Sequence, residues 1–170
     1  MQAIAVVGTK KSGKTTTIEN LTKELVKRGY KVAAIKHINE DFTIDTTGKD
    51  TWRYAQAGAK TIVAKGPNQI VTIEKTTQNT PLTALLKKCT GNDIVFIEGF
   101  KKTVAQNQNI PKIAVTKNQT EAENAQKTYN PMIAFSGPYN PKSTRIPYAD
   151  ATKNPEKLAN LIEKTLKANK

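Results

Sequence analysis

The sequence predicts an α/β fold, a doubly wound and mostly parallel β-sheet with flanking helices. Three observations predict it. A glycine-rich loop at residues 8–16 directly follows an apolar, strand-like run. Apolar runs then alternate with segments of helical spacing along the chain, which is typical of βαβ units. The run Ile-Val-Phe-Ile at 94–97 is continuously apolar, as expected for a central parallel strand that is buried on both faces.

Hydrophobic spacing predicts the first elements in order. Residues 3–7 are a predicted strand, and apolar residues recur at helical spacing from Ile18 until Gly29 ends the helix. Residues 31–36 are the second predicted strand. The polar, turn-rich stretch 37–49 follows that strand, and we expect it to be a functional loop.

A β-hairpin is predicted as an insertion after a short helix over roughly 50–57. The hairpin consists of two β-like runs, 61–64 and 69–73, on either side of Gly-Pro-Asn at 66–68. Residues 81–88 then carry three leucines on one helical face and predict another short helix.

The remaining chain contains three apolar runs and one amphipathic segment. The runs at 93–98, 113–115 and 132–135 predict strands, and an amphipathic helix begins near Pro155. The polar stretch 101–109 is predicted to be mobile.

Composition limits the class of protein. A length of 170 residues suits a single domain over 1–170, and no apolar run reaches the length of a membrane span. Cys89 is the only cysteine, so a reducing cytoplasm is the expected compartment. The formal net charge is +13, yet 24 of the 27 basic residues are lysines. Base-specific readout relies on arginine, so nucleic acid is not the expected partner.

The loop at 8–16 reads GTKKSGKTT and contains the pattern G-x-x-x-x-G-K-[ST]. Its backbone N–H groups are suited to wrap a polyphosphate, Lys14 to reach the β- and γ-phosphates, and Thr15 to offer a hydroxyl to Mg²⁺. The fold is therefore predicted to be of the P-loop NTPase type. The predicted nucleotide-binding residues are Gly8, Thr9, Lys10, Lys11, Ser12, Gly13, Lys14, Thr15 and Thr16.

An acidic residue is needed on the metal side of such a site. Asp93 and Glu98 bracket the same predicted strand, about 16 Å apart at 3.3 Å per residue. Ligands bind outside the carboxyl ends of parallel strands, and only Glu98 lies at that end. Glu98 is therefore the predicted metal-side acid, together with Thr15.

The second strand delivers Lys36 and His37 to the same edge. His37 is the sole histidine and is interpreted either as a structural residue or as an orienting or proton-transfer group. Asp45 is a candidate to reach the metal or the attacking water. Asp50 is either a further member of this loop or an ordinary residue in the first turn of a helix. His37, Asp45 and Glu98 form the candidate catalytic set.

The segment Thr-Lys-Asn-Gln at 116–119 follows a late strand, where GTP-binding domains often carry Asn/Thr-Lys-x-Asp. It lacks the aspartate. This segment therefore does not indicate guanine.

Taken together, five stretches resemble the MobB family, the GTP-binding adaptor of molybdopterin-guanine dinucleotide biosynthesis. They are GTKKSGKTT, RGYKVAAIKH, DTTGKD, AGA at 57–59 and FIEGFKK. The similarity covers about the first 102 residues and is weak beyond them. Members of this family commonly carry a second histidine shortly after the IKH histidine, whereas this chain has Asn39 and Glu40 there.

The resemblance implies binding of GTP and Mg²⁺ at 8–16, at most slow hydrolysis, and a homodimer. It implies partnership with the guanylyltransferase and molybdenum-insertion proteins of the pathway, with molybdopterin as a further candidate ligand. It places Lys14 and Thr15 on phosphate and metal, and Glu98 and Lys101 along the same edge. The facing loop that it implies contains Lys36, His37, Asp45 and Asp50.

Two other functions are weighed against this one. A small-molecule kinase or ATP-dependent ligase on the same fold usually needs a lid that carries arginine, and the chain has three arginines in all. An electrostatic nucleic-acid binder would lose affinity steeply as the salt concentration rises.

Overall fold

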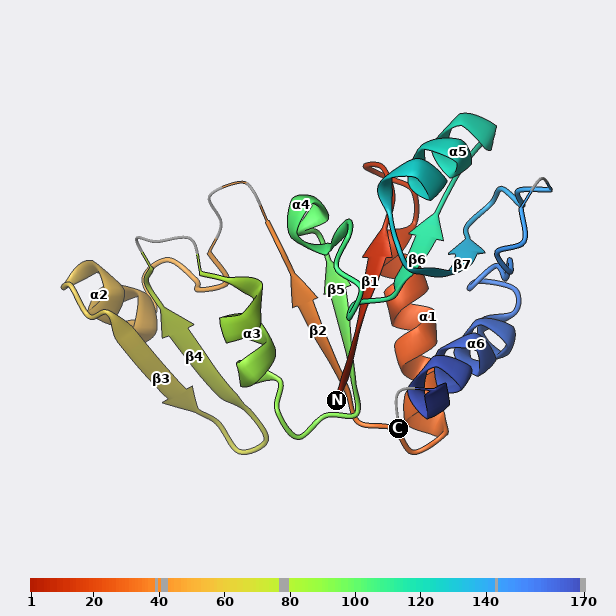
Figure 1. The fold of residues 1–170 in the computed structure, drawn as a ribbon. Coiled ribbons are helices and arrows are strands. Elements are labelled where there is room, and N and C mark those ends of the chain that lie inside the picture. The colour runs from red at the N-terminus through yellow and green to blue at the C-terminus, as the bar shows by residue number, and fades with distance from the viewer. Residues whose placement is uncertain (39, 41–42, 77–79, 143, 169–170) are drawn as a thin grey trace. The chain divides into compact units, whose positions relative to one another are not determined.

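Five parallel strands form the central sheet of the computed structural model (Figure 1). They pair in the order β2-β5-β1-β6-β7. Their bounds are β1 Gln2–Val7, β2 Val32–Lys36, β5 Ile94–Glu98, β6 Lys112–Val115 and β7 Met132–Ser136. The structure describes residues 1–38, 40, 43–76, 80–142 and 144–168. The predicted parallel α/β sheet is confirmed.

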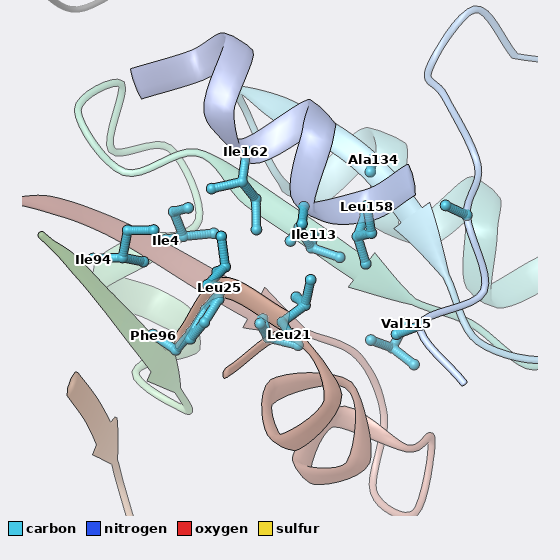
Figure 2. Close-up of a cluster of buried hydrophobic side chains, with 14 residues drawn as sticks. Ile4, Leu21, Leu25, Ile94, Phe96, Ile113, Val115, Ala134, Leu158 and Ile162 are labelled. Atoms are coloured by element: carbon cyan, nitrogen blue, oxygen red, sulfur yellow. The ribbon is translucent and has the colours of Figure 1, made fainter. Parts of the chain in front are cut away.

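Helices cover both faces of this sheet. Alternate residues of β1 point to opposite faces, so Ile4 and Val6 join one buried cluster while Ala5 and Val7 join the other. The first cluster includes side chains of α1 (Lys14–Lys27) and α6 (Pro155–Ala168), as Figure 2 shows. The second includes side chains of α3 (Leu82–Lys88), α4 (Lys101–Val104) and α5 (Gln119–Thr128). The sheet is therefore doubly wound.

The chain forms two compact units, residues 1–37 with 82–170, and residues 38–81. The second unit contains α2 (Asp50–Gln56) and an antiparallel hairpin of β3 (Thr61–Lys65) and β4 (Ile70–Glu74). The predicted hairpin is confirmed, and Gly66 N closes its loop by donating a 2.7 Å hydrogen bond to Gln69 O. The single domain over 1–170 stays a prediction.

The stretch 101–109, which the sequence predicts to be mobile, begins with a helix, and its mobility stays a prediction. Residues Lys101–Val104 form α4, whose Val104 side chain is fully buried against the sheet. Among the residues that the structure describes, no helix is both long and apolar enough to cross a bilayer.

Candidate functional site

Residues 8–13, the part of the predicted phosphate-binding pattern called the phosphate loop here, connect β1 to α1. Gly13 takes the left-handed conformation at φ 98° immediately before α1 begins at Lys14. Gly8 packs directly on the neighbouring strand, because a Cβ atom there would lie 2.4 Å from Val115 O and 2.7 Å from Ser12 Oγ. Glycine at residue 8 is therefore required by space as well as by backbone conformation.

The Lys14 side chain lies over this loop. Its Nζ atom donates a 2.6 Å hydrogen bond to Thr9 O, at the start of the loop. The Ser12 hydroxyl is buried inside the loop and has no hydrogen-bond partner among the described residues. A buried polar atom of this kind is normally satisfied, so the loop interior is suited to a polar ligand.

Several cations converge at this edge of the sheet. Burial is the main cause that lowers the pKa of the Lys14 amine, and the Glu98 carboxylate acts in the opposite direction. Three further ammonium groups lower the same pKa, those of Lys101, Lys36 and Lys117. Amines that repel one another in this way form a site for a polyanion.

Glu98 ends β5 beside the first turn of α1. Its Oε2 atom accepts a 3.0 Å hydrogen bond from Thr15 Oγ1 and lies 3.7 Å from Lys36 Nζ. Asp93 lies at the opposite end of β5, where its carboxylate accepts a 2.8 Å hydrogen bond from Lys31 N. The two carboxylates therefore occupy opposite edges of the sheet, as the strand length predicts.

A hydroxyl and one carboxylate fit Mg²⁺ in a nucleotide site, because this ion keeps several waters and takes other ligands from phosphate. Within the described part of the chain, no group of three or more His, Cys, Asp or Glu side chains is arranged to hold a metal by itself. The Thr15–Glu98 pair thus fits a metal that arrives with its nucleotide.

His37 lies at the carboxyl end of β2. Its backbone N donates a 2.8 Å hydrogen bond to Glu98 O, and its ring lies 4.6 Å from the ring of Phe100. Gly99 packs against it so closely that a Cβ there would lie 2.7 Å from the His37 Cβ. His37 is therefore held at the edge that carries Glu98, while its predicted role in catalysis stays a prediction.

Asp45 and Asp50 belong to the second unit. Asp45 Oδ1 accepts hydrogen bonds from Thr46 N at 2.9 Å and Thr51 Oγ1 at 2.8 Å, so it braces the loop before α2. Asp50 occupies the first turn of α2, exposed, with Oδ1 3.7 Å from Arg53 Nη1. Their roles at the phosphates stay predictions, and Asn39 and residues 41–42 of the same predicted loop lie outside the described residues.

Comparison with known proteins identifies the family. A family model described as molybdopterin guanine dinucleotide synthesis protein B, or MobB, matches residues 3–137. The chain belongs to the MobB family. The match extends well beyond residue 102, so the second half of the sheet, including β6 and β7, also shares the MobB pattern.

Three relatives of the chain are named as molybdopterin-guanine dinucleotide biosynthesis adapter proteins. The protein of Methanocaldococcus jannaschii is 39% identical over 120 residues, which are 70% of this chain and 49% of that protein. The Haemophilus influenzae protein is 31% identical, with 68% of this chain and 64% of that protein covered. The Bacillus subtilis protein is 30% identical, with 71% and 68% covered. The chain thus matches about half of the first relative and under two thirds of the second.

Solved MobB structures share the fold. A crystal structure of molybdopterin-guanine biosynthesis protein B superposes with a TM-score of 0.73 at 23% identity, covering 97% of this chain and 99% of the other. The MobB homolog of Bacillus stearothermophilus gives 0.72 at 19% identity, with 99% of each chain covered.

Sequence reasoning missed one residue at the site within this MobB-matching region. Glu121 in the first turn of α5 accepts a 2.9 Å hydrogen bond from the Thr9 hydroxyl of the phosphate loop. The helix itself carries a signal, since Asn118 caps it by accepting from Glu121 N, the spacing of an N-cap followed three residues later by glutamate. The contact with Thr9 has no local signal because 112 residues separate the two.

Proposed function

We propose that this chain is a GTP-binding adaptor in molybdopterin-guanine dinucleotide biosynthesis. The observation that carries the proposal is the Thr15–Glu98 hydrogen bond beside the Lys14 loop, in a chain of the MobB family. The names of its relatives support the pathway, and the loop supports the ligand. The chain is proposed to act in the cytoplasm.

The loop and the residues beside it have proposed tasks toward Mg²⁺ and GTP. The N–H groups of residues 8–16 and the Lys14 amine would hold the phosphates, and Thr15 with Glu98 would hold the metal. When bound, the metal supplies charge neutralisation at the β- and γ-phosphates. Hydrolysis is proposed to be slow or partner-dependent, with His37 and Asp45 as candidate groups that orient water.

The base is the part of the ligand that the side chains support least. In the segment 116–119, Asn118 Oδ1 already accepts from Glu121 N. Gln119 donates 2.5 Å to Glu123 and accepts from the Tyr139 hydroxyl. Because Asn118 and Gln119 already have hydrogen-bond partners within the protein, the guanine preference is proposed from the family and not from these side chains.

The proposed partners are the guanylyltransferase and the molybdenum-insertion proteins of the pathway, with molybdopterin as a candidate ligand and a homodimer as the assembly. A formal net charge of +13 favours partners with acidic surfaces. The adapter names of the relatives support this role.

The experiment measures binding of the purified chain to the guanylyltransferase, with and without Mg²⁺ and GTP. We expect a complex that Mg²⁺ and GTP strengthen, and we expect Lys14→Ala to lose that strengthening. Lys157→Ala, an exposed lysine on α6, is the matched control and should behave as wild type. If wild type bound the guanylyltransferase neither with nor without Mg²⁺ and GTP, the adaptor role would be contradicted.

A further inference from the structure

Glu121 joins two loops that are distant in sequence. Its Oε1 atom accepts from Thr9 Oγ1 at 2.9 Å, and its Oε2 atom accepts from Lys117 N at 2.9 Å. The Lys117 ammonium also lies 3.4 Å from Oε1. One carboxylate therefore contacts the phosphate loop and the loop after β6 at the same time.

Contacts within the protein fix the position of this carboxylate. Asn118 Oδ1 accepts a 2.9 Å hydrogen bond from Glu121 N, which sets the backbone that carries it. The Glu121 side chain is only 16% exposed, so solvent screens its charge less than at a free surface. Burial raises the pKa of Glu121, but hydrogen bonds from the Lys117 amide and the Thr9 hydroxyl outweigh burial and keep that pKa below its ordinary value. Glu121 is thus an anion at neutral pH.

We infer that Glu121 is a positioning residue that holds the phosphate loop and the loop at 116–118 after β6, here called the base-side loop, in one arrangement for the nucleotide. The inference rests on the proposed function, since it assigns the base to the loop where GTP-binding domains often recognise it. Glu121 acts through Thr9 and Lys117 and is not assigned any contact with the nucleotide.

The arrangement has a specific energetic consequence. Without the carboxylate, the Thr9 hydroxyl and the Lys117 amide would turn to water, and each loop would be ordered separately. A ligand that spans both loops would then bear the cost of ordering them. Pyrophosphate occupies only the phosphate loop, so it should be far less sensitive than GTP.

The experiment titrates Mg²⁺ with GTP, and Mg²⁺ with pyrophosphate, into wild type, Glu121→Gln and the control Glu156→Gln. Glutamine keeps the size of residue 121 but loses the charge and one of the two acceptor oxygens. We expect GTP to bind about tenfold more weakly, from the loss of one charge-assisted hydrogen bond. Pyrophosphate should lose less than about threefold, because the phosphate loop stays intact. Glu156→Gln, at an exposed glutamate on α6, should match wild type. Unchanged GTP affinity, or equal losses for both ligands, would overturn the inference.

A second variant guards against misfolding of the first. Thr9→Val removes the hydroxyl that donates to Glu121 and keeps the side-chain shape. The losses of GTP affinity from Thr9→Val and Glu121→Gln should be non-additive in the double variant, because both break the same contact. Strictly additive losses would overturn the inference.

The two proposals fail in distinguishable ways. If folded wild type bound no GTP, the proposed function would fail, and this inference would fail with it. If wild type bound GTP, Lys14→Ala did not, and Glu121→Gln bound as wild type does, only the positioning role would fail.

Discussion

The hydroxyl of Thr15 and the carboxylate of Glu98 lie 3.0 Å apart, although 83 residues separate them in sequence. β1 and β5 are parallel neighbours, so the loop after one and the residue at the end of the other meet at the same edge. The Lys36 amine, from β2 on the other side of β5, lies 3.7 Å from the same carboxylate oxygen. The carboxylate that is proposed to hold Mg²⁺ therefore has an ammonium group beside it.

Glu98→Gln should therefore remove the dependence of GTP binding on Mg²⁺. The metal loses its only anionic protein ligand in the proposed site, and we expect the gain in GTP affinity from Mg²⁺ to fall at least about tenfold. Calorimetric titrations with Mg²⁺ and with EDTA measure that gain. Asp93→Asn, at the other end of β5, is the matched control. If both variants kept the full Mg²⁺ effect, Glu98 would not be the metal-side acid.

Gly8→Ala tests the close approach of the loop to β6. The new Cβ would lie 2.4 Å from Val115 O, so the backbone must shift, and we expect a loss of at least about 2 kcal/mol in the free energy of unfolding. Gly91→Ala is the control, since that glycine is also at positive φ but has no atom within 4 Å of the added Cβ. It should lose only about 1 kcal/mol, the cost of the backbone conformation. Urea unfolding measures both, and equal losses would contradict the packing argument.

Lys112 makes stability depend on pH in an unusual direction. Its side chain is fully buried at the start of β6, where Nζ donates to Asn107 O at 2.7 Å and to Asn130 O at 2.5 Å. Burial lowers the pKa of Lys112 from 10.5 to about 8. Between these two values the unfolded chain binds a proton that the folded chain has released, so stability rises with pH.

Lys112→Met should abolish this rise. From about pH 7.5 to 9.5, the free energy of unfolding should increase by on the order of 1–2 kcal/mol more in wild type than in the variant. Thermal or urea unfolding across that range measures the difference. Lys157→Met, which changes an exposed lysine, should keep the wild-type slope. Parallel curves for wild type and Lys112→Met would contradict the burial argument.

Arg28 joins α1 to α6. Its guanidinium donates to Glu24 at 2.8 Å within α1, and to Asn160 at 2.7 Å and Glu163 at 2.9 Å on α6. Arg28→Ala should lower the free energy of unfolding by about 1–2 kcal/mol, because several partly shielded hydrogen bonds are lost together.

Arg53→Ala is the comparison for that variant. The Arg53–Asp50 pair is 3.7 Å long and both side chains are more than 70% exposed, so less than about 0.5 kcal/mol should be lost. Denaturant unfolding compares the two variants. An equal effect at both positions would show that Arg28 contributes no more than a surface charge.

Much of the fold follows from the sequence because the sheet strands are short apolar runs bounded by turns. The order of strands does not follow, since parallel pairing depends on contacts between distant segments. Two helices, α4 and α5, are not predicted from the sequence because they bury little apolar surface. α5 buries only Ala122 and Ala125, and α4 buries only Val104 in four residues. Small side chains give almost no hydrophobic periodicity, so their burial is decided by the sheet beneath them.

The candidate site likewise contains residues that the sequence predicts and residues that it does not. The loop residues and the choice of Glu98 over Asp93 follow from a motif and from the length of one strand. Glu121 does not, because an exposed-looking glutamate in a polar segment gives no sign of its contact with Thr9. Lys112 is likewise a lysine before a strand, and only the packed structure shows that its amine is buried.

A calorimetric titration of GTP and of ATP, each with Mg²⁺, into wild type and Lys14→Ala is the most direct test of GTP binding at the phosphate loop. Lys157→Ala serves as the matched control. We expect wild type and the control to prefer GTP and Lys14→Ala to bind neither nucleotide measurably. A clear preference for ATP would contradict the proposed guanine ligand and favour a small-molecule kinase or ligase. Equal binding by wild type and Lys14→Ala would contradict the phosphate site itself.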